Sequence, residues 1–125
     1  MKRVSELIAI TREVSPAVAR AELTHLPRVP IELATVLTEH SNYEQALANL
    51  GCSVRRLPAG DDLPDSMFVE DTAVVFDEIA IITRPGAESR RGETAGVEMS
   101  AKGNAGCMID STGCVLISGL CTSRE

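Results

Sequence analysis

Aromatic residues are the scarcest class in this 125-residue sequence. They make up 2% of it, with one tyrosine, two phenylalanines and no tryptophan. Proteins that stack nucleic-acid bases on aromatic side chains, or that enclose methylammonium groups in aromatic cages, need more of them. The composition therefore disfavours both classes, and any hydrophobic core must be built from aliphatic side chains.

Long apolar runs and an excess of positive charge are also missing. No stretch approaches the roughly 18 apolar residues that a membrane span requires. Acidic residues outnumber basic ones by 18 to 12, for a net charge of -6, which disfavours nucleic acids and anionic membranes as partners. Glu6 interrupts the short apolar stretch near the N-terminus, so we expect no secretory signal and a cytoplasmic location.

The four cysteines form no CxxC pair. Three of them, Cys107, Cys114 and Cys121, recur every seven residues, which is not a usual spacing of zinc ligands. Together with Cys52 they are expected to be free thiols in a chain without a secretory signal. We therefore expect no metal site.

The apolar pattern predicts an α/β fold. A strand is predicted over residues 3–11, and an amphipathic helix begins near Pro30 and ends at Gly51. Further strands are predicted at residues 52–57, 72–76 and 79–83, with turns at 58–62 and 77–78 and a second helix from Glu88. The first helix presents a single apolar face, made of Leu33, Val36, Leu37, His40, Tyr43, Leu47 and Leu50.

The last thirty residues differ from the rest. Residues 96–125 are rich in glycine, serine, threonine and cysteine, and their only convincing apolar run extends from Val115 to Ile117. We therefore divide the chain into an α/β region over residues 1–95 and an irregular tail over residues 96–125.

Negative charge is concentrated in one segment. Residues 1–60 carry a balance of +1 and residues 61–125 a balance of -7. Carboxylates flanking the apolar residues Phe68 and Val69 become partly desolvated, and a ligand guanidinium relieves that cost because its donors match carboxylates in pairs. Arginines between residues 84 and 91 supply a partner for a carboxylate, so the segment suits an arginine-like ligand. The alternative is that Asp71 and Arg90 are surface charges paired with each other.

Two motifs resemble a known family. Pro64-Asp-Ser-Met-Phe-Val-Glu-Asp71 and Ile81-Ile-Thr-Arg-Pro-Gly-Ala-Glu-Ser-Arg-Arg-Gly-Glu93 are similar to segments of the dimethylargininases, in the amidinotransferase-like or pentein superfamily. Residues 39–47 and the strand that ends at residues 10–12 resemble the same family, so the resemblance covers about residues 4–95. It implies the N-terminal portion, the first module and part of the next, of a five-bladed α/β propeller.

The resemblance also implies an activity. The family hydrolyses methylated arginine to citrulline and methylamines, in arginine metabolism and nitric oxide regulation, and needs no metal or organic cofactor. A carboxylate pocket keeps the guanidinium cationic, so that its carbon remains electrophilic for a cysteine thiolate. The substrate-binding positions match as follows: Asp65 and Asp71 bind the guanidinium, Glu70 lies beside them, Arg90 takes the α-carboxylate, and Leu23 lies in the region of a lid leucine.

The family's catalytic histidine and cysteine lie in later modules, beyond the matched stretch. In this chain His25 lies in a linker, His40 is expected to be structural, and Cys52 is expected to lie in the core. We therefore expect no catalytic residue here and no turnover of dimethylarginine by this chain alone. A frameshift, an alternative splice end or a truncated gene would each produce such a tail.

Three other readings of the acidic segment stay open. The first is that the chain belongs to another guanidine-modifying pentein, such as an arginine deiminase-like enzyme. A non-enzymatic module whose acidic segment contacts a basic partner fits the charge, and a Mg²⁺ or Ca²⁺ site fits the carboxylates but lacks a known loop pattern. An isolated propeller module leaves strand edges open, which favours self-association.

Overall fold

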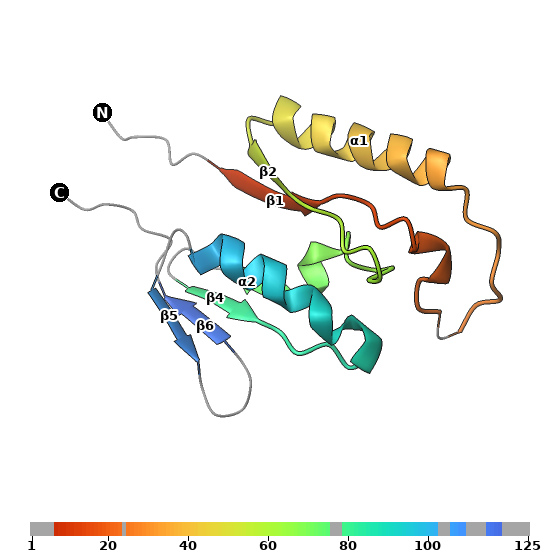
Figure 1. Cartoon of the computed structure of the whole chain (residues 1–125). Helices are drawn as coiled ribbons and strands as arrows, with labels where there is room; N and C mark the ends of the chain where they lie inside the picture. The colour runs from red at the N-terminus through yellow and green to blue at the C-terminus, as the bar shows by residue number, and fades with distance from the viewer. Residues whose placement is uncertain (1–6, 24, 76–78, 103–105, 110–114, 119–125) are drawn as a thin grey trace. The chain divides into compact units, whose positions relative to one another are not determined.

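The computed structural model describes residues 7–23, 25–75, 79–102, 106–109 and 115–118 (Figure 1). The chain divides into two compact units, unit 1 over Met1–Met67 and unit 2 over Phe68–Glu125. Both units combine helices with strands, as the sequence pattern predicts. None of the helices in the described ranges is long and apolar enough to cross a membrane.

Unit 1 is built on a pair of parallel strands. Strand β1 (Ile8–Arg12) pairs with β2 (Ser53–Leu57), with Ile8 opposite Ser53 and Arg12 opposite Leu57. Parallel strands need a long crossover, and helix α1 (Leu33–Asn49) supplies it and packs against β2 (Figure 1). A short 3₁₀ helix, η1 (Val18–Arg20), precedes the crossover.

The sequence locates the C-terminal end of α1 accurately. Gly51 has a positive φ of 91°, a conformation that costs glycine little. Its amide donates to the carbonyl of Ala48 and the amide of Cys52 donates to the carbonyl of Leu47, which together form a Schellman motif. The N-terminal end differs from the prediction, because the helix begins at Leu33 and Pro30 lies in the preceding segment.

The predicted apolar face of α1 is only partly covered. The buried residue of this helix is Glu44, at 5% exposure, while four apolar residues of the face are 37–79% exposed: Leu33, Leu37, Tyr43 and Leu50. Two strands are too narrow to cover a 17-residue helix along its length. The periodicity therefore identified the side of the helix that faces the sheet, but not which of its residues are buried.

Unit 2 is built on an antiparallel sheet of four strands in the order β3-β4-β6-β5. These are β3 (Ala73–Val75), β4 (Ile79–Ile82), β5 (Gly106–Ile109) and β6 (Val115–Ser118). Two 3₁₀ helices, η2 (Val69–Asp71) and η3 (Glu88–Glu93), flank β3 and β4, and helix α2 (Thr94–Lys102) contacts β4 and β6 (Figure 1). The predicted turn at residues 77–78 lies outside the described residues.

The tail is more regular than the sequence predicts. Helix α2 continues across residue 95, and β5 and β6 extend the sheet that β3 and β4 begin. The predicted irregular tail is therefore wrong for residues 106–109 and 115–118. Strand β6 pairs with the apolar strand β4 and β5 pairs with β6, which provides backbone partners that the glycine- and serine-rich composition does not indicate.

Polar residues make up much of the interior. Among the described residues the buried apolar side chains are Val14, Val18, Ala80, Ile82 and Val97. The buried polar ones are more numerous: Thr11, Arg12, Ser15, Glu44, Asp65, Ser66, Thr72 and Glu93. Buried polar groups are costly unless they are hydrogen-bonded, so their partners matter to the stability of both units.

Candidate functional site

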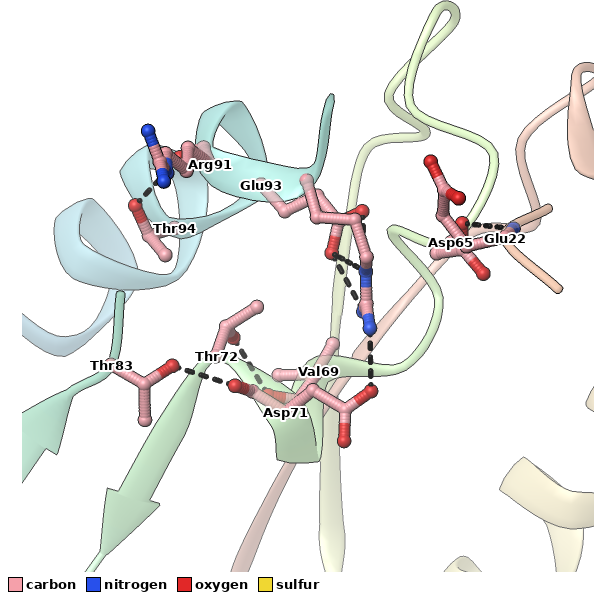
Figure 2. Close-up of polar contacts among 10 residues, drawn as sticks. Glu22, Asp65, Val69, Asp71, Thr72, Thr83, Arg91, Glu93 and Thr94 are labelled. Carbon is pink, nitrogen blue, oxygen red and sulfur yellow. Dashed lines mark hydrogen bonds and ion pairs between the residues drawn. The ribbon is translucent and has the colours of Figure 1, made fainter. Parts of the chain in front are cut away.

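Asp71 ends the 3₁₀ helix η2, and hydrogen bonds from Thr83, the residue that follows β4, hold this end of the helix. The Thr83 hydroxyl donates to the Asp71 carbonyl at 2.6 Å, and the Thr83 amide donates to the carbonyl of Thr72 at 2.9 Å. The Thr72 side chain is buried and donates to the carbonyl of Val69 at 2.7 Å (Figure 2). The backbone of Asp71 is thereby fixed, while its side chain is 52% exposed.

Arg90 joins two carboxylates of unit 2. Its Nε donates to both carboxylate oxygens of Glu93, at 3.1 and 3.2 Å, and its Nη2 donates to Glu93 Oε2 at 2.9 Å. Its Nη1 donates to Asp71 Oδ2 at 2.9 Å. The pairing of Asp71 with Arg90, one alternative raised by the sequence, is therefore present, and Glu93 is added to it.

The two halves of this cluster differ in strength. The side chains of Arg90 and Glu93 are 17% and 1% exposed, and breaking such a buried pair costs about 3–5 kcal/mol. The bond to the half-exposed Asp71 is screened by water and contributes roughly 0–1 kcal/mol. Glu93, and secondarily Asp71, raise the pKa of Arg90 above its ordinary value against the opposing effect of burial, so the guanidinium stays charged.

Asp65 and Leu23, both predicted to bind substrate, lie close together in unit 1. Asp65 is 6% exposed and its Oδ2 accepts a hydrogen bond from the backbone amide of Glu22 at 3.0 Å (Figure 2). Leu23 follows Glu22 and is 43% exposed. Asp65 thus links the segment after β2 to the segment that carries Leu23, which the sequence alone does not predict.

The remaining candidates are spread over both units. Glu70 lies in η2 and is exposed. His25 is exposed, and Cys52 is a half-buried free thiol at the start of β2. In the part of the chain that the structure describes, no group of three metal-ligating side chains comes together. Cys114 and Cys121 lie outside the described residues.

Unit 1 contains a second charged cluster that the sequence analysis missed. Glu44 accepts hydrogen bonds from the Thr11 hydroxyl at 2.6 Å and from the Nε of Arg56 at 3.0 Å, and it also pairs with Arg56 Nη2. His40 Nε2 lies 3.3 Å from Glu44 Oε1, so this histidine is part of the same cluster. Arg56 lowers the pKa of Glu44 more than burial raises it. The cluster fastens α1 to both strands, and a cavity of about 260 Å³ lies beside Glu44 and Arg56.

Spacing was the signal that could have revealed both buried glutamates. Glu44 follows His40 by four residues and Glu93 follows Arg90 by three, which are the separations at which side chains on one helical turn meet. The spacing indicates which side chains are neighbours on a helix. It does not indicate which member is buried, and so neither glutamate stood out.

Comparison with characterised proteins gives consistent results. The chain is 44% identical over 102 residues to N(G),N(G)-dimethylarginine dimethylaminohydrolase of Streptomyces coelicolor, a match that covers 82% of this chain and 39% of that protein. It is 46% identical over 67 residues to the protein of the same name from Pseudomonas aeruginosa, covering 54% of this chain and 26% of that one. No protein-family model matches the chain.

The structural comparison reaches the same proteins. A solved structure of the Pseudomonas aeruginosa enzyme, a cysteine-to-serine mutant in complex with citrulline, matches with a TM-score of 0.68 and 38% identity. The match covers 73% of this chain and 35% of that one. The mixed helix and strand content of the chain is therefore that of a dimethylarginine dimethylaminohydrolase over most of its length, while the chain spans less than two fifths of each relative.

Proposed function

We propose, from the premise that this chain is related in sequence and fold to the dimethylarginine dimethylaminohydrolases, that it carries part of a binding site for methylated arginine. The observation that carries the proposal is the Asp71–Arg90–Glu93 cluster. Methylated arginine has a guanidinium cation at one end and an α-carboxylate near the other. The cluster offers a half-exposed carboxylate next to a permanently charged guanidinium, which complements both charges.

The roles follow from the resemblance and from exposure. Asp71 is the acid that water reaches, so it receives the ligand's guanidinium, with Glu70 beside it on η2. Arg90 receives the carboxylate through its Nη1. By the resemblance alone, Asp65 and Leu23 of unit 1 are also assigned to substrate binding. Asp71 and Arg90 are bonded to each other here, so a ligand that engages both must first displace this exposed hydrogen bond.

We also propose that this chain alone does not hydrolyse methylated arginine. Hydrolysis of a guanidinium by this family's chemistry needs a thiolate with a histidine beside it. In unit 1, His40 lies against Glu44 and Cys52 precedes β2, and among the described residues no hydrogen bond joins a cysteine to a histidine. Binding without hydrolysis is therefore the expected behaviour, in a cytoplasmic chain that belongs to part of a propeller and tends to self-associate.

The test is a two-dimensional ¹H–¹⁵N spectrum of the full chain, titrated with asymmetric dimethylarginine. Saturable shifts in η2 and η3 are expected, and Asp71→Asn should abolish them because the ligand cation loses its exposed charge partner. Arg84→Ala is the control, since Arg84 is exposed and lies in the motif that contains Arg90. Shifts that survive Asp71→Asn would point to a general acidic interaction surface instead.

A titration with unmethylated arginine distinguishes a dimethylargininase-like site from an arginine deiminase-like one. A site for methylated arginine binds the dimethylated compound more tightly, because methyl groups add apolar contact. A preference for unmethylated arginine would favour an arginine deiminase-like protein. The absence of shifts with either ligand would reject the proposal for this chain.

A further inference from the structure

Glu93 is the most completely enclosed group in the cluster, and it is not one of the predicted substrate-binding residues. The residue is 0% exposed. Its two oxygens accept three hydrogen bonds from Arg90, two from Nε and one from Nη2, at 2.9–3.2 Å. The Nε side of the guanidinium is therefore committed to Glu93 in a two-pronged contact, which fixes the plane of the group as well as its position.

The opposite side of the guanidinium makes a different contact. Nη1 donates to Asp71, whose side chain is 52% exposed, whereas the side chain of Glu93 is 1% exposed. Water competes for the Asp71 contact and is excluded from the Glu93 contact. Of the two carboxylates, Asp71 is the one that an incoming ligand can replace.

We infer that Glu93 is a positioning residue that anchors Arg90 while its Nη1 contact is exchanged between Asp71 and a ligand carboxylate. This inference rests on the proposed function, in which Arg90 receives the ligand's α-carboxylate and Asp71 its guanidinium. When Asp71 turns to the ligand cation, Arg90 loses one hydrogen bond and keeps those to Glu93. Its Nη1 therefore stays where the carboxylate arrives.

Charge alone predicts the opposite effect of Glu93. A buried carboxylate beside Arg90 reduces the attraction of the guanidinium for a second anion. If orientation did not matter, removing the charge of Glu93 would tighten the binding of a carboxylate ligand. The sign of the change therefore separates positioning from simple electrostatics.

The first experiment compares two ligands on the full chain with Glu93→Gln. Asymmetric dimethylarginine carries the carboxylate, and its decarboxylated analogue keeps the guanidinium and the amine but has no carboxylate. We expect the variant to bind the first about tenfold more weakly and the second within about twofold of wild type, as for the loss of one well-placed charge-assisted contact. Glu88→Gln, on the exposed side of the same 3₁₀ helix, is the control and should change neither. Tighter binding of the first ligand, or equal weakening of both, would overturn the inference.

The second experiment needs no ligand and no change at Glu93. The Nε–H signal of Arg90 should stay protected in the Asp71→Asn variant, because that hydrogen is donated to Glu93. Loss of the signal in this variant would overturn the inference, and this holds also if Glu93→Gln does not fold. If the wild-type chain binds neither compound, the proposed function fails, while the Nε–H signal still decides whether Glu93 anchors Arg90.

Discussion

Each unit of the chain buries a glutamate against an arginine, but the exposed residue of the cluster is basic in unit 1 and acidic in unit 2. In unit 1 the buried acid Glu44 is held by Arg56, whose side chain is 53% exposed. In unit 2 the buried acid Glu93 holds Arg90, whose side chain is 17% exposed and which extends to the half-exposed Asp71. The more exposed member of the cluster is thus the cation Arg56 in unit 1 and the acid Asp71 in unit 2.

This difference distinguishes a structural cluster in unit 1 from a candidate binding site in unit 2. The unit 1 cluster joins α1, β1 and β2, and each of its hydrogen bonds stabilises the packing of helix on sheet. The unit 2 cluster joins residues of η2 and η3, and it presents a half-exposed carboxylate to solvent beside a largely buried guanidinium. A buried ion pair therefore says little about function until the exposure of both partners is known.

The largest effect is expected from Glu93→Ala. It leaves Arg90 largely buried without its main partner, so the free energy of unfolding of unit 2 should fall by about 3–5 kcal/mol. Urea titration followed by the amide signals of β3 and β4 measures this loss. Glu88→Ala is the matched control at an exposed position of η3 and should change stability by less than about 0.5 kcal/mol. Equal losses in both variants would remove the distinction between the buried and exposed acids of η3.

Lowering the pH is expected to have a smaller effect on stability, and this effect concerns unit 1. The pKa of Glu44 is lowered from 4.5 in the folded chain, so the unfolded chain binds its proton first and Glu44 adds stability above that pH. This contribution should disappear as the pH falls from 4.5 through the lower folded value, by about 1.4 kcal/mol for each pKa unit. Tyr43 is the sole tyrosine and lies on α1, so its fluorescence reports the unfolding of unit 1.

Glu44→Gln supplies the control for the acid effect. The variant should be less stable than wild type at neutral pH and should lose less stability on acidification, because the titrating group has been removed. An unchanged acid slope would show that another carboxylate of unit 1 carries the effect.

The smallest effect on stability is expected from Asp71→Asn. Its hydrogen bond to Arg90 is half-exposed and single, so the free energy of unfolding should change by at most about 1 kcal/mol. A melting curve checks this alongside Glu93→Ala. A loss as large as that of Glu93→Ala would mean that Asp71 is a structural partner of Arg90, and it would weaken the case for an exchangeable contact.

The fold could be predicted from sequence where local rules decide it. Gly51 marks the end of α1 because a Schellman motif needs a positive φ there, and the strand at residues 79–82 follows from a short apolar run. Burial was harder, since it depends on the width of the sheet beneath the helix. Leu33 and Leu50 fit the apolar face but extend beyond the cover that two strands provide.

The candidate site could be predicted only in part for a similar reason. Sequence motifs named Asp71 and Arg90, and the structure brings these two together. Glu93 stood at the end of the same motif, yet an acidic residue in a charged run looks like any solvated residue until its enclosure is seen. The roles of Asp65, Glu70, Asp71, Arg90 and Leu23 in binding substrate stay predictions.

The parallel pairing of β1 with β2 sets an order of events during synthesis. Ile8 must wait for Ser53, 45 residues later, which at 5–20 residues per second takes roughly 2–9 seconds. Helix α1 lies between them and forms its local hydrogen bonds within microseconds of emerging. Strand β1 therefore waits for several seconds, whereas α1 ends at Asn49, seven residues before Arg56, and is complete for only about 0.4–1.4 seconds before the charged contact that joins helix to sheet can form.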